Sequence, residues 1–123
     1  DYLKSIINSL PSGQLREDVV IRYYRHEKDG NKVDALKDLG YYIHEKKATE
    51  TAGLGSNVLI YGENVTTEDI KIVAYTLIDQ GLPLKAIYHT QFEWKSTSLE
   101  IGTDTLLTED SILSPQDISN FKK

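Results

Sequence analysis

The sequence predicts a small α/β (α+β) domain of the ferredoxin-like type, a βαββαβ sandwich, and two observations lead to this fold. A strand-like segment, a helical segment closed by a glycine, and a second strand-like segment follow one another twice along the chain. The connection between the two repeats, residues 48–56, is short for another crossover helix. We therefore expect one four-stranded antiparallel sheet with both helices on one face. A small doubly wound sheet with all strands parallel is the alternative.

The chain of 123 residues divides into a core and two flanking segments. Residues 1–18 are expected to form an N-terminal helix and a linker, because apolar side chains recur at helical spacing before Pro11 stops the run. Residues 19–103 hold the βαββαβ core and a possible fifth strand. Residues 104–123 form a C-terminal tail with a short helix. Because the sequence begins at Asp1 and contains no methionine, we expect a domain cut from a larger protein.

The first repeat begins with a strand. Residues 19–25 are β-branched and aromatic, a composition typical of strands. The turn residues 29–31 then lead into an apolar stripe over residues 33–39, which predicts a helix. Gly40 follows where a helix-ending glycine belongs. Residues 41–46 predict the second strand.

The second repeat has the same order and stronger signals. Residues 57–61 predict a strand, and residues 66–69 (TTED) have the composition of a helix start. The apolar residues within 70–78 recur at helical spacing, so the helix runs to Gly81. Residues 84–89 predict the fourth strand.

Two further elements follow the repeats. Residues 97–101 alternate in polarity and predict the fifth strand. The residues 114–117 (SPQD) are a helix-start signal, with Ile118 and Phe121 available to dock the short helix that follows.

The composition argues against several classes of partner. The formal net charge of −5 opposes binding to a phosphate backbone, so no nucleic acid is expected. The sequence contains no cysteine, which excludes disulfides and thiolate metal sites. Apolar runs stay well below the roughly 18 residues of a membrane span.

The sequence also carries no catalytic, metal or cofactor motif. The histidines His26, His44 and His89 are too scattered to predict a metal site, so we expect structural or solvent-exposed roles. The glycines in residues 53–56 precede a strand instead of opening a helix, which is typical of a connector and not of a phosphate loop. The carboxylates of residues 68–69 are explained by the helix start. We therefore predict no enzymatic activity, no metal and no cofactor.

The distribution of tyrosines points to one face of the sheet. Adjacent strand residues face opposite sides, so each of the pairs Tyr23-Tyr24 and Tyr41-Tyr42 places one ring away from the helices. The same alternation on the third strand sends Leu59 and Tyr61 outward, whereas the fourth strand is ambiguous. The open sheet face is thus predicted to carry Arg22, Tyr24, Tyr42, His44, Leu59 and Tyr61. Flat rings beside arginine and histidine suit stacking on a sugar, a base or a peptide.

Two loop aromatics, Phe92 and Trp94, are additional candidate contacts for a ligand. The alternative interpretation is that the segments outside the repeats, residues 1–18 and 90–123, lie across the sheet face. In that arrangement the tyrosines would form a second small core instead of a binding surface.

With this order of elements, the chain resembles the SPOR domain and the C-terminal domain of LytR-type proteins, which are small accessory domains of bacterial envelope proteins. The matching parts are Val19–Arg25, the helix end from Val33 to Gly40 and the helix from Ile70 to Gly81. The resemblance implies glycan binding on the exposed sheet face, through Tyr24 and Tyr61, and a location in the cell envelope. The Asn-Gly turn that follows the first strand in LytR-type domains is absent here.

From these observations we expect a non-catalytic accessory domain of a larger bacterial protein. It would bind a partner protein or a neighbouring domain through the open sheet face and the loop aromatics. Binding of a peptidoglycan strand or a small ligand on the same face is the alternative that the resemblance implies. An RNA-binding domain of related fold conflicts with the acidic charge, and an acylphosphatase-like enzyme lacks an Arg–Asn phosphate cradle.

Overall fold

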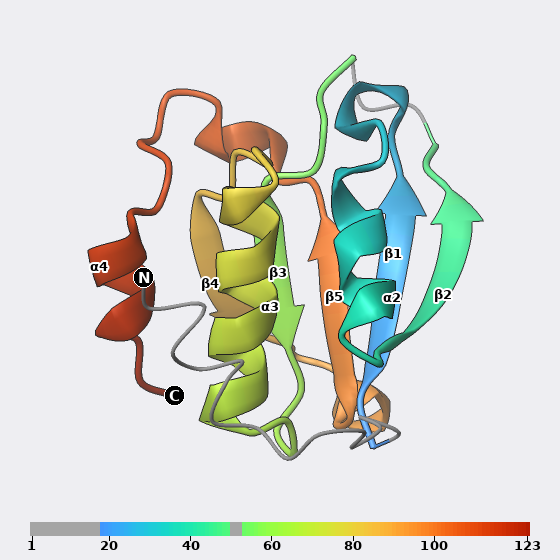
Figure 1. Ribbon diagram of the computed structural model, residues 1–123, viewed down its shortest axis with the longest axis vertical. Helices are drawn as coiled ribbons and strands as arrows, with labels where there is room; N and C mark the ends of the chain where they lie inside the picture. The colour runs from blue at the N-terminus through green and yellow to red at the C-terminus, as the bar shows by residue number, and fades with distance from the viewer. Residues whose placement is uncertain (1–17, 50–52) are drawn as a thin grey trace.

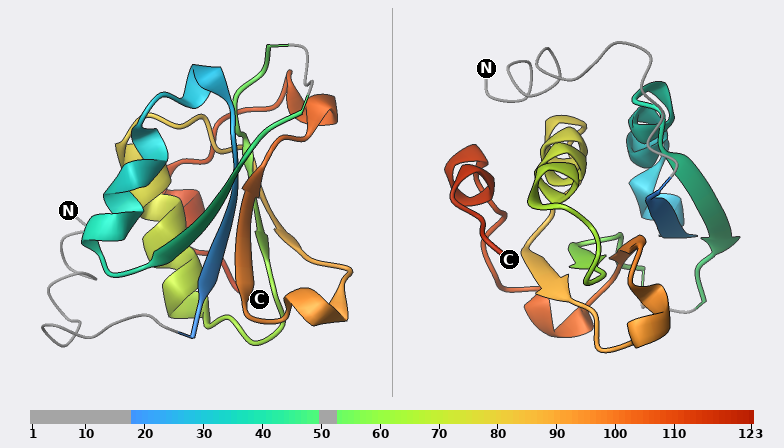
Figure 2. Two further views of the ribbon diagram at one scale, coloured as in Figure 1. Left: turned by 90° about the vertical axis from the view of Figure 1, so that its right-hand side faces the viewer. Right: turned by 90° about the horizontal axis from the view of Figure 1, so that it is seen from below.

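A five-stranded mixed β-sheet forms the centre of the protein, with the helices on one of its faces (Figures 1 and 2). The computed structural model describes residues 18–49 and 53–123. The strands are β1 (Val20–Arg25), β2 (Tyr42–Lys47), β3 (Val58–Tyr61), β4 (Ala86–His89) and β5 (Ser98–Gly102). The helices are α2 (Ala35–Asp38), α3 (Thr67–Asp79) and α4 (Pro115–Ser119). Short 3₁₀ turns lie at Glu27–Asp29, Lys32–Asp34, Glu93–Lys95 and Thr105–Leu107.

The strands lie in the order β2-β1-β5-β3-β4. Each strand–helix–strand unit pairs its own two strands in parallel, β1 with β2 and β3 with β4. Such parallel pairs need a crossover connection, which α2 and α3 supply. β5 lies between the two units, parallel to β1 and antiparallel to β3.

The structure confirms the α/β class, the fifth strand and the short C-terminal helix, but the strand pairing differs from the ferredoxin-like expectation. The two units do not form a four-stranded antiparallel sheet, and the sheet is not wholly parallel either. The reason lies in β5, whose residues Ser98, Leu99, Ile101 and Gly102 are buried. A strand buried on both faces belongs at the centre of a sheet, whereas the largely exposed β2 is suited to an edge. The N-terminal helix expected before residue 18 lies outside the described residues.

The first connecting helix is shorter than the sequence pattern predicts. A 3₁₀ turn at Lys32–Asp34 precedes α2, and together they bury Val33 and Leu36 completely. Gly40 ends the segment with a φ of 94°, a conformation that favours glycine. The connection therefore covers β1 with a few apolar side chains instead of a long helix.

The second connecting helix, α3, matches the prediction. Thr66 caps it, because the Thr66 Oγ1 accepts a hydrogen bond from the backbone N–H of Asp69 at 3.1 Å. Ile70, Val73 and Leu77 are completely buried at helical spacing. α3 is therefore the main helix packed on the sheet.

The hydrophobic core fills the layer between the sheet and the helices. Ile21, Leu59, Leu99 and Ile101 contribute the sheet side of this core. α4 extends the layer beside α3, where Ile118 is completely buried. All three helices lie on the same side of the sheet in the side view (Figure 2). The C-terminal helix consequently does not cover the opposite face.

We predict that β5 is essential for stability because it joins the two units. Leu99→Ala removes a completely buried side chain from β5 and should lower the free energy of unfolding by about 2–5 kcal/mol. The matched control is Leu106→Ala, at an exposed leucine, which should change it by less than about 0.5 kcal/mol. Urea denaturation measures both values. A Leu99→Ala variant as stable as the Leu106→Ala variant would contradict the central position of β5.

Candidate functional site

The face of the sheet opposite the helices, called the open face below, is built from rows of side chains that cross all five strands. The central row is fixed by the strand register: Arg22 is opposite His44 on one side and Glu100 on the other. Glu100 in turn is opposite Ile60, and Ile60 is opposite Tyr88. The open face is therefore a continuous surface that runs across both strand–helix–strand units.

Aromatic side chains are concentrated on or beside this face. The described residues expose seven large apolar side chains, and five of them belong here. They are Tyr24, Tyr42, Tyr88, Phe92 and Trp94. Tyr42 is 63% exposed and Trp94 is 68% exposed, so both rings are available to a ligand. The structure thus places Arg22, Tyr24, Tyr42 and His44 on the open face, as the alternation along β1 and β2 predicts.

The predicted placement of Leu59 and Tyr61 is wrong. Leu59 is completely buried and Tyr61 is 8% exposed, because both side chains face the helices. The Tyr61 ring meets the Phe121 ring edge-on, with 5.7 Å between their centroids. β3 (VLIY) is apolar at every position, so its sequence gives no signal for which side faces inward. Pairing with β5, which sets Leu59 opposite Ile101, decides the orientation.

A loop carrying Phe92 and Trp94, residues 90–96, is fastened to one end of the open face. Lys95 Nζ forms an ion pair with Glu100 Oε1 at 2.7 Å, and both side chains are mostly buried. The same ammonium lies 5.0 Å from the centroid of the Trp94 ring, and the Arg22 guanidinium lies 5.2 Å from it. These cation–π contacts hold the exposed indole in a defined position.

The loop can approach the sheet closely because Gly62 has no side chain. A Cβ atom at Gly62 would collide with the backbone carbonyl oxygens of Lys95 and Ser96. The backbone N–H of Asn64 donates to the Ser96 carbonyl at 2.8 Å and fixes this approach. The position of Trp94 therefore depends on a tight backbone contact far from it in the sequence.

Beside this loop, the open face is hollowed by a cavity of about 460 Å³. Its lining includes Ile60, Tyr88, Phe92, Lys95 and Glu100. The sequence did not identify Tyr88, Lys95 or Glu100 as site residues. Tyr88 lies on the strand whose alternation was ambiguous, and the Lys95–Glu100 pair joins a 3₁₀ turn to a strand, a spacing that neither helical nor strand periodicity indicates.

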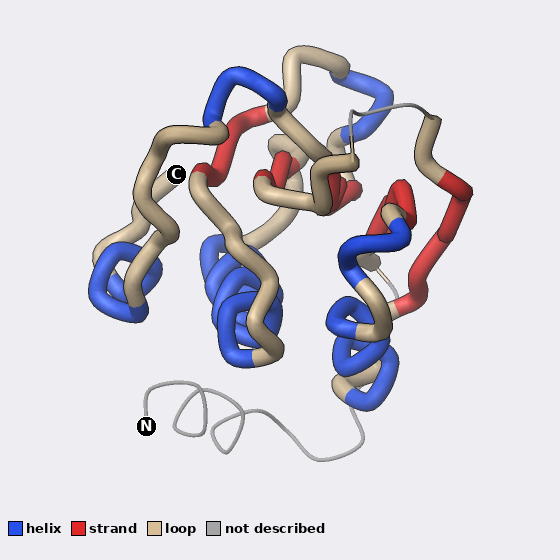
Figure 3. Tube along the Cα trace, turned by 90° about the horizontal axis from the view of Figure 1, so that it is seen from above, coloured by secondary structure: helices blue, strands red, loops and turns tan. Residues whose placement is uncertain are grey.

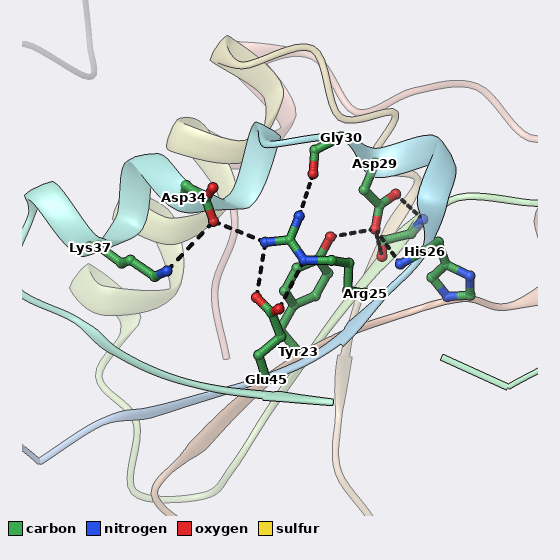
Figure 4. A network of polar contacts seen from close by, with 9 residues as sticks. Tyr23, Arg25, His26, Asp29, Gly30, Asp34, Lys37 and Glu45 are labelled. Atoms are coloured by element: carbon green, nitrogen blue, oxygen red, sulfur yellow. Dashed lines mark hydrogen bonds and ion pairs between the residues drawn. The ribbon is translucent and has the colours of Figure 1, made fainter. Parts of the chain in front are cut away.

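A separate polar network lies at the carboxyl end of β1 (Figure 4). Asp29 is 2% exposed, and its carboxylate accepts hydrogen bonds from the Tyr23 hydroxyl, from the Ser56 backbone N–H and from the Ser56 hydroxyl, each at 2.7 Å. A buried carboxylate is stable only with such partners. The network joins the end of β1 to the segment that leads into β3.

Neighbouring contacts extend this network. The Arg25 guanidinium donates to both Glu45 carboxylate oxygens at 2.9 Å and to Asp34 at 3.1 Å. The hydrogen bond from Arg25 lowers the pKa of Glu45 below its usual range. His26 and Thr103 share a hydrogen bond of 2.8 Å between Nε2 and Oγ1. These groups hold β1, β2 and the residue after β5 together.

The three histidines are dispersed over the structure. His26 belongs to the network at the carboxyl end of β1, His44 lies on the open face, and His89 pairs with Glu63 at 2.8 Å. In the described part of the chain, no three acidic, histidine or cysteine side chains are close enough to hold a metal ion together. Within the same residues no helix has the length and apolar character needed to span a membrane.

Searches against family models, curated proteins and solved structures gave no match for this chain. Its function therefore has to follow from the geometry of the open face and of the carboxyl ends of β1 and β5.

We predict that the Tyr23–Asp29 hydrogen bond makes stability sensitive to alkaline pH. Burial, followed by the hydrogen bond to Asp29, raises the pKa of Tyr23 far above its usual range. Unfolded Tyr23 loses its proton near pH 10, whereas the folded residue keeps it. The contribution of the protonated Tyr23 to the free energy of unfolding is therefore complete below about pH 10 and declines as the pH rises further.

Urea denaturation of the wild type and of Tyr23→Phe between neutral and alkaline pH measures this effect. At neutral pH the variant should be less stable by about 1–3 kcal/mol, because Asp29 loses a donor. The difference should shrink above about pH 10. A difference in the free energy of unfolding that stays constant from neutral pH to above about pH 10 would contradict a raised pKa of Tyr23 in the folded protein.

Proposed function

We propose that the chain is a non-catalytic interaction domain of a larger bacterial protein, which binds a partner polypeptide or a neighbouring domain through the open face. One observation carries this proposal: five of the seven exposed large apolar side chains of the described residues lie on or beside one sheet face. Monomeric soluble proteins rarely expose large contiguous apolar patches, and such patches mark interaction sites.

The composition of the open face supports a polypeptide partner. Tyrosine, tryptophan and arginine are the residues enriched at protein interfaces and among the side chains that dominate binding energy. Tyr42 and Trp94 are the most exposed rings of the surface, and Arg22 lies beside Trp94. Because Arg22 and Lys95 already hold the indole, a partner would meet a side chain that loses little conformational freedom on binding.

The charges of the open face favour a partner with acidic side chains. Arg22 and Lys46, which is opposite Tyr24 in the strand register, carry positive charge, while Lys95 and Glu100 neutralise each other in their ion pair. The whole chain has a net charge of −5, so this face differs in sign from the average surface. Complementary charge raises the rate of association and excludes partners of the wrong sign.

Two pairs of polar side chains on the face are occupied with one another, which fits binding better than catalysis. Lys95 pairs with Glu100, and Arg22 Nε donates to Ser98 Oγ at 2.9 Å. A catalytic nucleophile would need a nearby base oriented toward it. Ser98 is instead 4% exposed and accepts a hydrogen bond from a guanidinium.

Glycan binding, together with a location in the cell envelope, is the second candidate. The observation that favours it is the cavity of about 460 Å³, in which Tyr88 and Phe92 flank the charged pair Lys95 and Glu100. Rings beside hydrogen-bonding groups suit a sugar. Tyr61, which the resemblance to SPOR domains implicated, lies on the other side of the sheet and would not take part.

A peptide-display selection on the immobilised chain of 123 residues tests the proposed function. Selected peptides should be rich in acidic and apolar side chains. Their affinity should fall about tenfold or more in Tyr42→Ala and in Trp94→Ala, since loss of an aromatic anchor costs roughly 1–2 kcal/mol or more. Fluorescence anisotropy measures the affinities.

The matched control is Leu106→Ala, which removes an exposed apolar side chain outside the open face and should leave affinity unchanged. Equal binding by all three variants would contradict the proposal. A parallel sedimentation with purified peptidoglycan separates the two candidates. Retention of the wild type but not of Phe92→Ala, which changes the lining of the cavity, without selected peptides, would establish glycan binding instead.

A further inference from the structure

A second cavity, called the lysine pocket below, lies at the carboxyl ends of β1 and β5. Figure 3 views the molecule from this end of the strands. Its volume is about 430 Å³, within the roughly 300–1,000 Å³ of small-molecule sites. Three lysines line it: Lys28 and Lys32 from the connection after β1, and Lys85 from the residue before β4. Such a convergence of positive charge stands out in a chain of net charge −5.

Among the described residues, no carboxylate forms an ion pair with the three ammonium groups. Lys85 Nζ donates to the Thr108 carbonyl at 2.9 Å and Lys32 Nζ to the Asp29 carbonyl at 3.4 Å. Neither these two nor Lys28 takes part in any of the ion pairs formed by the described residues. An ammonium has three donors, so donors remain for a ligand.

Asp29 also lines the pocket, and its carboxylate already accepts hydrogen bonds from the protein itself. It accepts hydrogen bonds from Tyr23 and from two groups of Ser56 and is 2% exposed. This network also holds Gly55 against Asp29, since a Cβ atom at Gly55 would lie 2.7 Å from Asp29 Oδ1. The wall of the pocket is therefore built by the buried network that defines the end of β1.

A structural role explains only part of the lysine cluster. Cations beside the C-terminal end of a helix complement its dipole, and Lys32 Cε would lie 3.6 Å from a Cβ atom placed on Gly81, just after α3. That contact uses one lysine. Lys28 and Lys85 come from other segments, and a requirement of the helix end does not explain why they share this cavity.

The remaining lining of the pocket is largely apolar. Leu54, Pro83 and Ile112 provide this apolar surface. A pocket with ammonium groups and an apolar wall suits a molecule with a multiply charged head and an apolar body. Such a molecule would gain both charge-assisted hydrogen bonds and buried apolar area.

The position of the pocket in the sheet is also one where ligands bind. β1 and β5 are adjacent and parallel, and the chain leaves their carboxyl ends toward opposite sides. After β1 it runs to α2 and β2, and after β5 it runs to α4 beside α3 (Figure 1). Open α/β sheets bind ligands outside the carboxyl ends of their strands, and the pocket lies at that end of β1 and β5.

We propose that the lysine pocket binds a small organic phosphate. The phosphate groups contact Lys28, Lys32 and Lys85, and the organic part lies on Leu54, Pro83 and Ile112. The pocket is at the carboxyl ends of β1 and β5, whereas the proposed partner surface is on the open face of the sheet. Either site can therefore fail its test without affecting the other.

Titration of the ¹⁵N-labelled chain with ADP, followed by amide chemical shifts, tests the proposal. ADP should shift the amides of Lys28, Lys32, Leu54 and Lys85 in a saturable manner, and adenosine should bind at least tenfold more weakly. Inorganic phosphate should cause the lysine shifts but not the shift of Leu54. Binding should weaken as salt is raised, because exposed charges are screened.

The double variant Lys28→Gln, Lys85→Gln should weaken ADP binding at least tenfold while keeping the amide spectrum of a folded chain. The control variant Lys47→Gln, Lys122→Gln removes the same charge from exposed positions outside both candidate sites and should bind as the wild type does. Three results would overturn the proposal. They are the absence of saturable shifts, equal weakening in both variants, and equal affinity for adenosine and ADP.

Discussion

The pairing of β5 with both β1 and β3 is the constraint on which the rest of the structure depends. Each strand–helix–strand unit supplies only two parallel strands, and a sheet of two strands is marginal by itself. β5 joins the units by running parallel to β1 and antiparallel to β3. Leu99 and Ile101, both completely buried, place this strand under the helices of both units.

Both candidate sites follow from that pairing. On the open face, Glu100 of β5 connects Arg22 of one unit with Ile60 of the other and anchors Lys95. At the carboxyl ends of the strands, β5 ends beside β1, and Thr103 forms hydrogen bonds with His26 and Gly55. The open face offers rings held on a rigid sheet. The lysine pocket offers charge beside an apolar wall.

Local patterns in the sequence predicted the elements and the part of the open face that lies on β1 and β2. Helix caps, helix-ending glycines and the alternation along a strand are local properties. The Thr66 cap and the outward Tyr42 are examples. Features that depend on distant partners could not be predicted. The four apolar residues of β3 did not indicate which side faces the helices, so Tyr61 was misplaced. The lysine pocket exists only once the segments after β1, α3 and β5 are brought together.

Hydroxyl-radical footprinting of the tyrosines tests the central claim most directly, namely that β5 joins the units with one face of the sheet left open. Comparison among tyrosines removes differences in intrinsic reactivity. The structure predicts rapid oxidation of Tyr42, at 63% exposure, and slow oxidation of Tyr23 and Tyr61, at 1% and 8%. Protection of Tyr42 as strong as that of Tyr23, or rapid oxidation of Tyr61, would contradict this arrangement of the sheet.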